Sequence, residues 1–420
     1  MYRPCKRKKT TKGLGIRLSY FIDAYNVLRE VYGEGKYLTD AVANIPNGED
    51  RALITRIVYG VIEKDVTLTY IIGNLTDKTP KPQARLVLKI GLYCLRYMDS
   101  LPNYSVCDNA VKLVKAIGKP HLAGFINATL KRAIGRDFVP QDKIERLSVN
   151  TSTPLWITKK VVKQYKDDAT AILSHKPTTK THIRRNGLKW VKERFQECFK
   201  DFELSEVGGI YAEPNDEIKS LFNEGKITYQ SPLSMKIAQL SVEGEGGKIL
   251  DVCSAPGGKS VYMSELAGSK VLAFDIHPHR VELIKKYADR MGAKVEAVVQ
   301  DATVFIPKYA EIFDVVLCDV PCSGIGVRYS KPDVLLNRQE SDIPELCKLQ
   351  EAILDTSSRY VKVDGALVYS TCTIFEEENE RVVKRFTQSH PEFSVEKVIK
   401  STPGVNGDEG FFAVKLRRNI

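Results

Sequence analysis

The chain has 420 residues, 43% of them hydrophobic, which is enough for two or three globular domains. Its formal net charge of +11 favours a polyanionic partner, most simply nucleic acid. No apolar stretch reaches membrane-spanning length and the basic N-terminus lacks the apolar core of a signal peptide, so a membrane protein and a secreted protein are both disfavoured.

The nine cysteines indicate a reducing compartment, because an odd number in a large chain gives no disulfide framework. Zinc is not expected, since Cys318 and Cys322 are close in sequence but no second Cys or His pair follows at finger spacing. We therefore expect a cytoplasmic protein that binds no metal, and we expect it to be a monomer.

The chain begins with a basic tail, residues 1–19. Residues 1–20 hold seven Lys or Arg and no acidic residue. Such a charge run is either a disordered, solubilising segment or an arm that contacts phosphates, and the tail alone does not decide between the two.

Residues 20–140 predict an all-helical domain. Apolar residues follow the i, i+3, i+4, i+7 rule from Cys107 to Ile117, with Ser105 as the expected N-cap and Gly118 as the expected C-cap. The same period recurs one helix earlier and one helix later. Short loops between amphipathic helices indicate a compact bundle.

A small α+β subdomain is predicted over residues 150–240, after a polar linker at residues 140–154. The stretch Thr178–Lys200 holds seven Lys or Arg against two acidic residues. We expect the basic side chains around Arg184 and Arg185 to bind RNA phosphates.

Residues 241–420 predict a doubly wound, Rossmann-like α/β domain with a parallel sheet. Helical patterns separate apolar runs of strand length, as in alternating strand and helix folds. The runs are Lys248–Asp251, Lys270–Asp275, Val295–Gln300, Phe313–Asp319, Ala366–Ser370 and Phe411–Leu416. In such sheets ligands bind outside the carboxyl ends of the strands, so the polar residues that follow these runs are the candidates for a site.

A Gly-rich turn follows the first strand, with the sequence Cys253-Ser254-Ala255-Pro256-Gly257-Gly258-Lys259. It lets a ligand approach the backbone closely at a helix N-terminus. The turn is neither G-x-G-x-x-G nor a P-loop, which disfavours a dinucleotide and a triphosphate and leaves a nucleoside without a pyrophosphate. Taken alone, the two glycines are also compatible with a simple tight turn.

Acidic residues follow the next two strands. Asp275 ends the second strand, where a carboxylate can bind both hydroxyls of a ribose. Asp301 follows the third strand and can meet an adenine amino group. Each is equally a helix cap when seen alone, but together with the Gly-rich turn they form one adenosine-shaped site.

Two cysteines follow the fourth and fifth strands, and both thiols are expected to reach one crevice. Cys322 comes shortly after Asp319, and Cys372 follows the fifth strand. The C5 atom of cytosine is a poor nucleophile, but addition of a thiolate at C6 turns it into an enamine-like carbon that attacks a methyl donor. One thiol for attack and a second group for release fit this cycle. Inert buried cysteines are the alternative, and spacing does not choose which thiol attacks.

These segments together resemble RNA cytosine-5 methyltransferases of the bacterial Sun/Fmu (RsmB) family, which also resemble the nucleolar NOL/NOP enzymes. The matching segments are DVCSAPGGKS, VLAFDIHPHR, VVQDAT, FDVVLCDVPCSGIGVRYSKPD, LVYSTCTIFEEENE and GFFAVKL. The resemblance implies S-adenosylmethionine as the cofactor, held by the loop from Cys253 to Lys259. It also implies that Asp275 binds the ribose, that Asp301 lies at the adenine and that Arg280 lies on the cofactor side.

The resemblance also assigns the catalytic residues. It implies that Cys372, in the Thr-Cys pair, is the nucleophile and that Cys322, in the Pro-Cys pair, assists product release. Asp319 is implied to lie between the cofactor and the cytosine, where a carboxylate can accept a hydrogen bond from the exocyclic amine.

The helical domain resembles the NusB-like domain that is fused to Sun/Fmu enzymes, and this fusion implies 16S ribosomal RNA as the partner. The segments are ALITRIVYGVIEK, LKIGLYCLRYM and LAGFINATLKRAIGR, and THIRRNGLK is loosely similar to the family's RNA-facing subdomain. Two positions depart from the family pattern: Ser254 stands where alanine is more usual, and Glu409 replaces a common aspartate. Neither touches the expected chemistry.

The sequence thus predicts methylation of C5 of one cytosine in 16S rRNA through a covalent bond between Cys372 and C6. The base must leave its stack to reach the thiol, so a single-stranded or flipped cytosine is expected. Two alternatives stay open: a tRNA cytosine-5 methyltransferase, and a non-catalytic RNA-binding ribosome assembly factor that has kept a cofactor fold.

Overall fold

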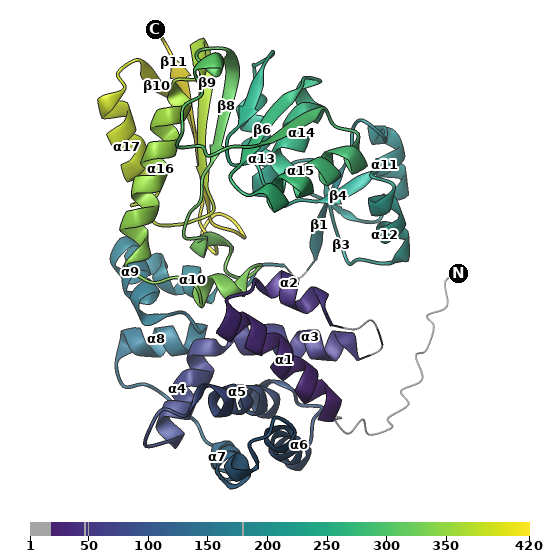
Figure 1. The fold of residues 1–420 in the computed structure, drawn as a ribbon, viewed down its shortest axis with the longest axis vertical. Helices are drawn as coiled ribbons and strands as arrows, with labels where there is room; N and C mark the ends of the chain where they lie inside the picture. The colour runs from purple at the N-terminus through teal and green to yellow at the C-terminus, as the bar shows by residue number, and fades with distance from the viewer. Residues whose placement is uncertain (1–17, 46–47, 49, 179) are drawn as a thin grey trace. The chain divides into compact units, whose positions relative to one another are not determined.

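The structure, a computed structural model, describes residues 18–45, 48, 50–178 and 180–420 (Figure 1). The predicted basic tail lies outside the described residues, except that residues 18 and 19 begin the first helix. The chain divides into two compact units. One comprises Met1–Gln164 with Tyr329–Asn337, and the other comprises Tyr165–Arg328 with Arg338–Ile420.

The first unit is helical, as predicted. Helix α5 is its centre, since α1, α3, α4, α6 and α7 all pack against it and nine consecutive residues of it, from Leu86 to Cys94, are buried. Apolar side chains from every one of these helices form one core. The helices are α1 (Leu18–Glu34), α2 (Leu38–Ala43), α3 (Arg51–Glu63), α4 (Asp65–Leu75), α5 (Pro82–Tyr97), α6 (Asn103–Ala116), α7 (Ala123–Ala133), α8 (Lys143–Thr151) and α9 (Leu155–Tyr165).

Two local predictions for this unit are wrong. Helix α6 begins at Asn103 after Pro102, so Ser105 lies inside the first turn and is not the N-cap. The segment expected to be a polar linker forms α8, because Asp142 caps it by accepting from the N–H groups of Ile144 (3.0 Å) and Glu145 (2.8 Å). Gly118 does follow the end of α6 with φ of +74°, a conformation that glycine adopts without strain.

The second unit opens with α10 (Ala169–Ser174) and a small antiparallel sheet, which confirms the predicted α+β subdomain but starts it later, at Thr181. The strand order is β2-β3-β1-β4, and Ile183 pairs with Ile210 on one side and Tyr229 on the other. Helices α11 (Lys192–Cys198) and α12 (Asp216–Asn223) pack on it around a core that includes Phe195. The strands are β1 (Thr181–Arg185), β2 (Glu203–Leu204), β3 (Ile210–Ala212) and β4 (Ile227–Tyr229).

A seven-stranded sheet forms the rest of this unit, in the order β10-β11-β9-β8-β5-β6-β7. The strands from β9 to β7 in this order are parallel, as predicted, and β11 and β10 add an antiparallel edge. The sequence did not predict β10, because its middle residues are exposed and its apolar residues are interrupted by charges. The strands are β5 (Ile249–Asp251), β6 (Val271–Asp275), β7 (Val295–Val299), β8 (Phe313–Asp319), β9 (Val361–Thr371), β10 (Phe393–Ser401) and β11 (Phe411–Arg418).

Helices cover both faces of this sheet (Figure 1). On one face, side chains of α16 (Asp342–Ser358) and α17 (Glu380–Ser389) pack on strand residues such as Val316. On the other, α13 (Pro232–Val242) and α14 (Gly258–Ala267) pack on residues such as Val315, and α15 (Pro278–Met291) packs against α14. This alternation confirms the doubly wound fold. Among the described residues, no helix has the length and apolarity that crossing a membrane requires.

Candidate active site

The two catalytic candidates Cys322 and Cys372 meet at one edge of the large sheet. Strands β8 and β9 are parallel neighbours, with Asp319 opposite Ser370, and each cysteine lies on the loop after its strand. The two Sγ atoms are 3.3 Å apart, and the backbone N–H of Cys372 donates to Sγ of Cys322 at 3.3 Å. The two thiols therefore come together at this edge, as the sequence predicted.

The environments of the two thiols differ. Cys322 is buried, whereas Cys372 is only partly buried. The hydrogen bond with Cys372, together with burial, raises the pKa of the Cys322 thiol well above its usual value. A Cys322 that keeps its proton can donate it to Sγ of Cys372, and hydrogen bonding to a thiolate favours the charged form. The backbone N–H of Cys372 opposes this rise in the pKa of Cys322, but the net direction is upward.

Asp319 lies beside the thiols as an anchored carboxylate. Its Oδ2 accepts from Nζ of Lys259 at 2.6 Å, and its Oδ1 accepts from Oγ of Ser370 at 2.7 Å. Burial lowers the pKa of Lys259, but the charge and hydrogen bond of Asp319 outweigh it, so the net change is upward. This charged pair joins the predicted cofactor loop to the predicted catalytic loop.

The Gly-rich turn connects β5 to α14 with glycine where the backbone requires it. Gly257 has φ of +104°, and a Cβ atom there would lie 3.2 Å from Cγ2 of Ile284. At Gly258 a Cβ atom would meet nothing closer than 3.8 Å. The first glycine is therefore needed for the fold, whereas a side chain at the second would make only ordinary contacts, with Gln230 and Tyr287.

Buried hydroxyl groups of the turn and of α14 form hydrogen bonds with the carboxylate that ends β5. Oγ of Ser260 donates to Oδ2 of Asp251 at 2.5 Å, and it lies 2.6 Å from Oγ of Ser254. Burial raises the pKa of Asp251 to about 7, against the opposing hydrogen bond from Ser260. Burial likewise raises the pKa of Cys253 well above its usual value. The serine that replaces the usual alanine thus extends a buried hydrogen-bond chain to Asp251.

The two acids predicted to hold an adenosine lie at the ends of adjacent strands. Oδ1 of Asp275 accepts from the N–H of His277 at 2.9 Å, and Oδ1 of Asp301 accepts from N–H (2.8 Å) and Oγ1 (2.7 Å) of Thr303. Each acid therefore closes a local turn, and neither is the helix cap that was the alternative for it, since the next helices have His277 and Ile306 at their N-caps. Both still lie at the same sheet edge as the Gly-rich turn, and Arg280 lies nearby in the first turn of α15.

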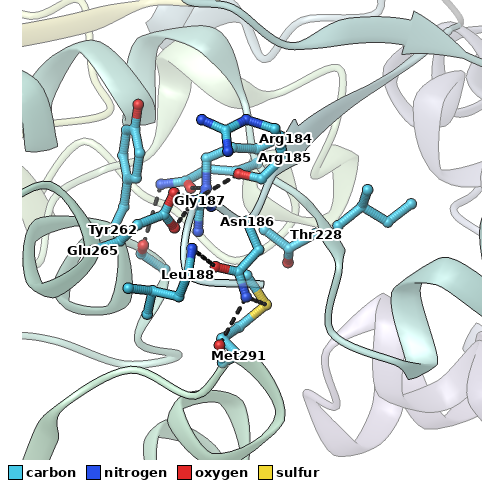
Figure 2. A network of polar contacts seen from close by, with 12 residues as sticks. Arg184, Arg185, Asn186, Gly187, Leu188, Thr228, Tyr262, Glu265 and Met291 are labelled. Carbon is cyan, nitrogen blue, oxygen red and sulfur yellow. Dashed lines mark hydrogen bonds and ion pairs between the residues drawn. The ribbon is translucent and has the colours of Figure 1, made fainter. Parts of the chain in front are cut away.

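Arg184 does not lie where an RNA phosphate can reach it. Its side chain is buried, with 1% of the residue exposed, and the guanidinium forms an ion pair with Glu265 of α14. Nε donates to Oε1 of Gln230 at 2.8 Å, and the guanidinium carbon lies 4.2 Å from the centre of the Tyr262 ring. The prediction for Arg184 is wrong because its guanidinium is buried and is neutralised by Glu265, which lies far along the chain. Figure 2 shows this network.

Arg185 has a different environment. It is partly exposed, and its guanidinium donates to the backbone oxygen of Trp190. The next residues continue the network of Figure 2: Asn186 donates to the oxygen of Met291 at 2.7 Å, and the N–H of Gly187 donates to Glu265 at 2.6 Å. This turn therefore connects the small sheet to helices α14 and α15, which pack on the large sheet. Phosphate binding by Arg185 stays a prediction.

Sequence reasoning missed Glu378, which is fully buried behind the two cysteine loops. It belongs to the acidic run after Cys372, and such a run is typical of an exposed face. In the sequence, Glu378 differs from Glu376 and Glu377 only in that Asn379 follows it. Its partners are Ser323, Gln350 and Thr373.

Among the described residues, no group of three or more His, Cys, Asp or Glu side chains is arranged to hold a metal ion.

The doubly wound sheet, the Gly-rich turn after its first strand and the polar residues at its carboxyl edge define an α/β methyltransferase. Residues 238–417 match the family model described as 16S rRNA methyltransferase RsmB/F, and residues 23–135 match the NusB family. The chain is 32% identical to the probable ribosomal RNA small subunit methyltransferase B of Bacillus subtilis over 90% of this chain and 92% of that protein. It belongs to the RsmB/F family and carries an N-terminal NusB domain.

Further relatives agree with this assignment. The chain is 28% identical to the ribosomal RNA small subunit methyltransferase B of Proteus mirabilis, over 94% of this chain and 97% of that one. The crystal structure of the protein PH0851 superposes with a TM-score of 0.82 at 25% identity, covering 96% of this chain and 100% of the other. The likeness therefore extends over nearly the whole chain.

Proposed function

We propose that this protein methylates C5 of one cytosine in 16S rRNA, with S-adenosylmethionine as the methyl donor, through a covalent bond between Sγ of Cys372 and C6 of the base. The observation that carries the proposal is the pair of thiols 3.3 Å apart at the sheet edge that also holds the Gly-rich turn. The names of the relatives support the small-subunit rRNA as the substrate.

The residues around the turn fit an adenosine-containing cofactor. The Gly-rich turn at the N-terminus of α14 suits close approach of a ligand to the backbone. The carboxylate of Asp275 is suited to the ribose hydroxyls, and Asp301 is suited to the adenine amino group. Arg280 and the loop from Cys253 to Lys259 complete the expected set. When bound, S-adenosylmethionine supplies an electrophilic methyl group.

The chemistry of the chain's own residues follows from their placement. The thiolate of Cys372 forms a bond to C6, and C5 becomes nucleophilic enough to accept the methyl group. The carboxylate of Asp319 is suited to accept a hydrogen bond from the exocyclic amine of the cytosine. C5 then loses its proton to a base and the bond between sulfur and C6 breaks. Cys322 is the group next to the departing sulfur, which is why we assign it to release.

The helical unit and the basic charge of the chain support an RNA partner, and the target base must leave its stack to reach Cys372. Flipping costs a few kcal/mol, least where the RNA is already looped. A cytoplasmic location and a monomeric state stay predictions.

Mapping of 5-methylcytosine in 16S rRNA after incubation with purified protein and S-adenosylmethionine tests the proposal. The wild-type protein should methylate one cytosine, and Cys372→Ala should lose turnover while it still binds RNA. Retained methylation by Cys372→Ser would overturn the covalent mechanism. Methylation of tRNA alone would point to the tRNA enzyme, and RNA binding without any methylation would point to an assembly factor.

A further inference from the structure

Glu378 is a fully buried acid that the proposed reaction does not use. It lies six residues after Cys372, just before α17, and none of its surface is exposed. Burial raises its pKa, opposed by hydrogen bonds from Ser323, Gln350 and Thr373. A buried carboxylate has a large desolvation cost, which several hydrogen bonds must offset. Its partners therefore indicate what it does.

The first partner is the loop that carries Cys322. The backbone N–H of Ser323 donates to Oε1 of Glu378 at 2.7 Å, and Oγ of Ser323 donates to Oε2 at 2.6 Å. Both oxygens of the carboxylate are thus bound to the residue directly after Cys322. Ser323 is itself fully buried. This two-point contact fixes both the position and the orientation of the peptide next to the thiol.

The second partner is the loop that carries Cys372. Oγ1 of Thr373 lies 2.7 Å from Oγ of Ser323, so the residues after the two cysteines are joined directly. The neighbour of Glu378, Asn379, accepts from Oγ1 of Thr371 at 2.6 Å and donates to the oxygen of Thr373 at 3.1 Å. The residues on both sides of Cys372 are therefore held by the Glu378–Asn379 pair.

The third partner is helix α16. Nε2 of Gln350 donates to Oε1 of Glu378 at 3.1 Å and to the oxygen of Pro321 at 3.0 Å, which holds the residue before Cys322. The hydroxyl of Tyr369 donates to the backbone oxygen of Glu378 at 2.5 Å. Gln350 and Tyr369 are both fully buried. Each cysteine is thus flanked on both sides by contacts that lead to Glu378 or to Asn379.

We propose that Glu378 is a positioning residue that holds the Cys322 loop and the Cys372 loop together and so sets the separation of the two thiols. It acts through Ser323, Thr373 and Gln350, and its negative charge also raises the pKa of the Cys322 thiol. The consequence for turnover rests on the proposed function, because it assumes that Cys322 assists release of the base from Cys372. The consequence for the separation of the thiols does not depend on that assumption.

Three variants and one control test the proposal. Glu378→Ala removes every side-chain acceptor, Glu378→Asp shortens the arm, and Glu378→Gln keeps an acceptor for the N–H of Ser323 and can donate to its hydroxyl. Glu376→Ala is the matched control, since Glu376 lies in the same acidic run but is 41% exposed and pairs with Arg381 at the surface. Thermal unfolding identifies any variant that does not fold.

The first readout is the separation of the thiols in the protein alone. A diazene oxidant converts the two thiols to a disulfide and is itself reduced to the hydrazine, and peptide mass spectrometry follows the Cys322–Cys372 link. The wild type, Glu376→Ala and Glu378→Gln should close the link at similar rates. Glu378→Ala and Glu378→Asp should close it about tenfold more slowly, because misplacement by about 1 Å already lowers reaction rates strongly.

The second readout is turnover on 16S rRNA. Glu378→Ala should lower kcat about tenfold with KM for S-adenosylmethionine little changed, and it should accumulate the covalent protein–RNA adduct. Glu378→Gln should restore both. An unchanged disulfide rate and kcat in Glu378→Ala, or in Glu378→Asp if the alanine variant does not fold, would overturn the positioning role. A slower disulfide rate with no adduct in any variant, Cys322→Ala included, would support positioning and overturn the release chemistry.

Discussion

Sγ of Cys322 lies 3.3 Å from Sγ of Cys372, although 50 residues separate them in the chain. The hydrogen bond between them, together with burial, raises the pKa of Cys322, which is the more buried of the two thiols. Two neighbouring thiols cannot both ionise easily, because the second charge would lie next to the first. The difference in burial is compatible with the proposed roles, in which Cys372 is the nucleophile and Cys322 assists release.

Replacement of Cys322 by alanine should trap the covalent adduct. The variant keeps the Cys372 nucleophile and lacks the group next to the departing sulfur, so the adduct should form and then break slowly. A retarded band on a denaturing gel, dependent on RNA, measures it. The band should disappear when Cys372→Ala is added to the same chain. A folded Cys322→Ala protein that turns over normally and gives no band would contradict the release role.

The stability of the catalytic domain should fall as the pH rises from about 4 to about 7 because of Asp251, whose pKa is raised by burial to about 7 from a usual value of 3.8. The folded state therefore binds the proton more tightly than the unfolded state in this range. The stabilisation is fully present below the unfolded pKa and is lost as the pH passes the folded one. The loss is at most about 4 kcal/mol, at about 1.4 kcal/mol for each pKa unit.

Asp251→Asn is the variant that isolates this contribution, since an amide resembles the protonated acid in shape and charge. Urea unfolding of both proteins at pH 5 and pH 8 measures it. The wild type should lose more stability than the variant between these two pH values. Equal losses in the two proteins would show that Asp251 does not titrate in this range.

The large sheet and the meeting of the two thiols could be predicted from the sequence because they follow from local rules. A fully buried parallel strand such as Phe313–Asp319 is an uninterrupted apolar run, and parallel strands bring their carboxyl ends to one edge. The position of Cys372 beside Cys322 follows from the adjacency of two such strands. The order of the strands in the sheet is enough to predict that the two thiols meet, without knowledge of any side-chain contact.

The rest depended on contacts between distant residues. The charge of Arg184 indicated phosphate binding, and only the fold reveals that Glu265, 81 residues further along, neutralises it. Strand β10 was missed because an exposed edge strand carries charged residues among its apolar ones. Glu378 was missed because an acidic run is usually solvated, whereas this one ends in a carboxylate with buried donors around it.

RNA binding should weaken steeply as salt concentration rises, because lysine and arginine contacts to phosphates release counterions. Affinity for a 16S rRNA fragment, measured by fluorescence anisotropy between about 50 and 200 mM salt, should fall by at least about tenfold for a few phosphate contacts. Arg185→Ala should lower the affinity and reduce the slope of the salt dependence if it contacts a phosphate. An affinity that is flat across this range would contradict the electrostatic account of RNA binding.

Loss of the Glu265 carboxylate should destabilise the domain far more than loss of a surface acid. The ion pair between Arg184 and Glu265 is almost fully buried, with side-chain exposures of 2% and 8%. Glu265→Ala leaves a buried guanidinium without its counter-charge, which costs about 3–5 kcal/mol in typical proteins. One nitrogen of Arg184, Nη2, already lacks a hydrogen-bond partner, and the guanidinium carbon lies over the Tyr262 ring.

Urea unfolding measures this effect, and Asp216→Ala is the control, since Asp216 forms an exposed pair with Lys219 and should contribute little. Replacing both buried partners with apolar residues, as in Arg184→Met with Glu265→Leu, should recover much of the lost stability because no charge is then left uncompensated. If Glu265→Ala unfolds at the same urea concentration as the wild type, the ion pair between β1 and α14 contributes nothing to the stability of the domain.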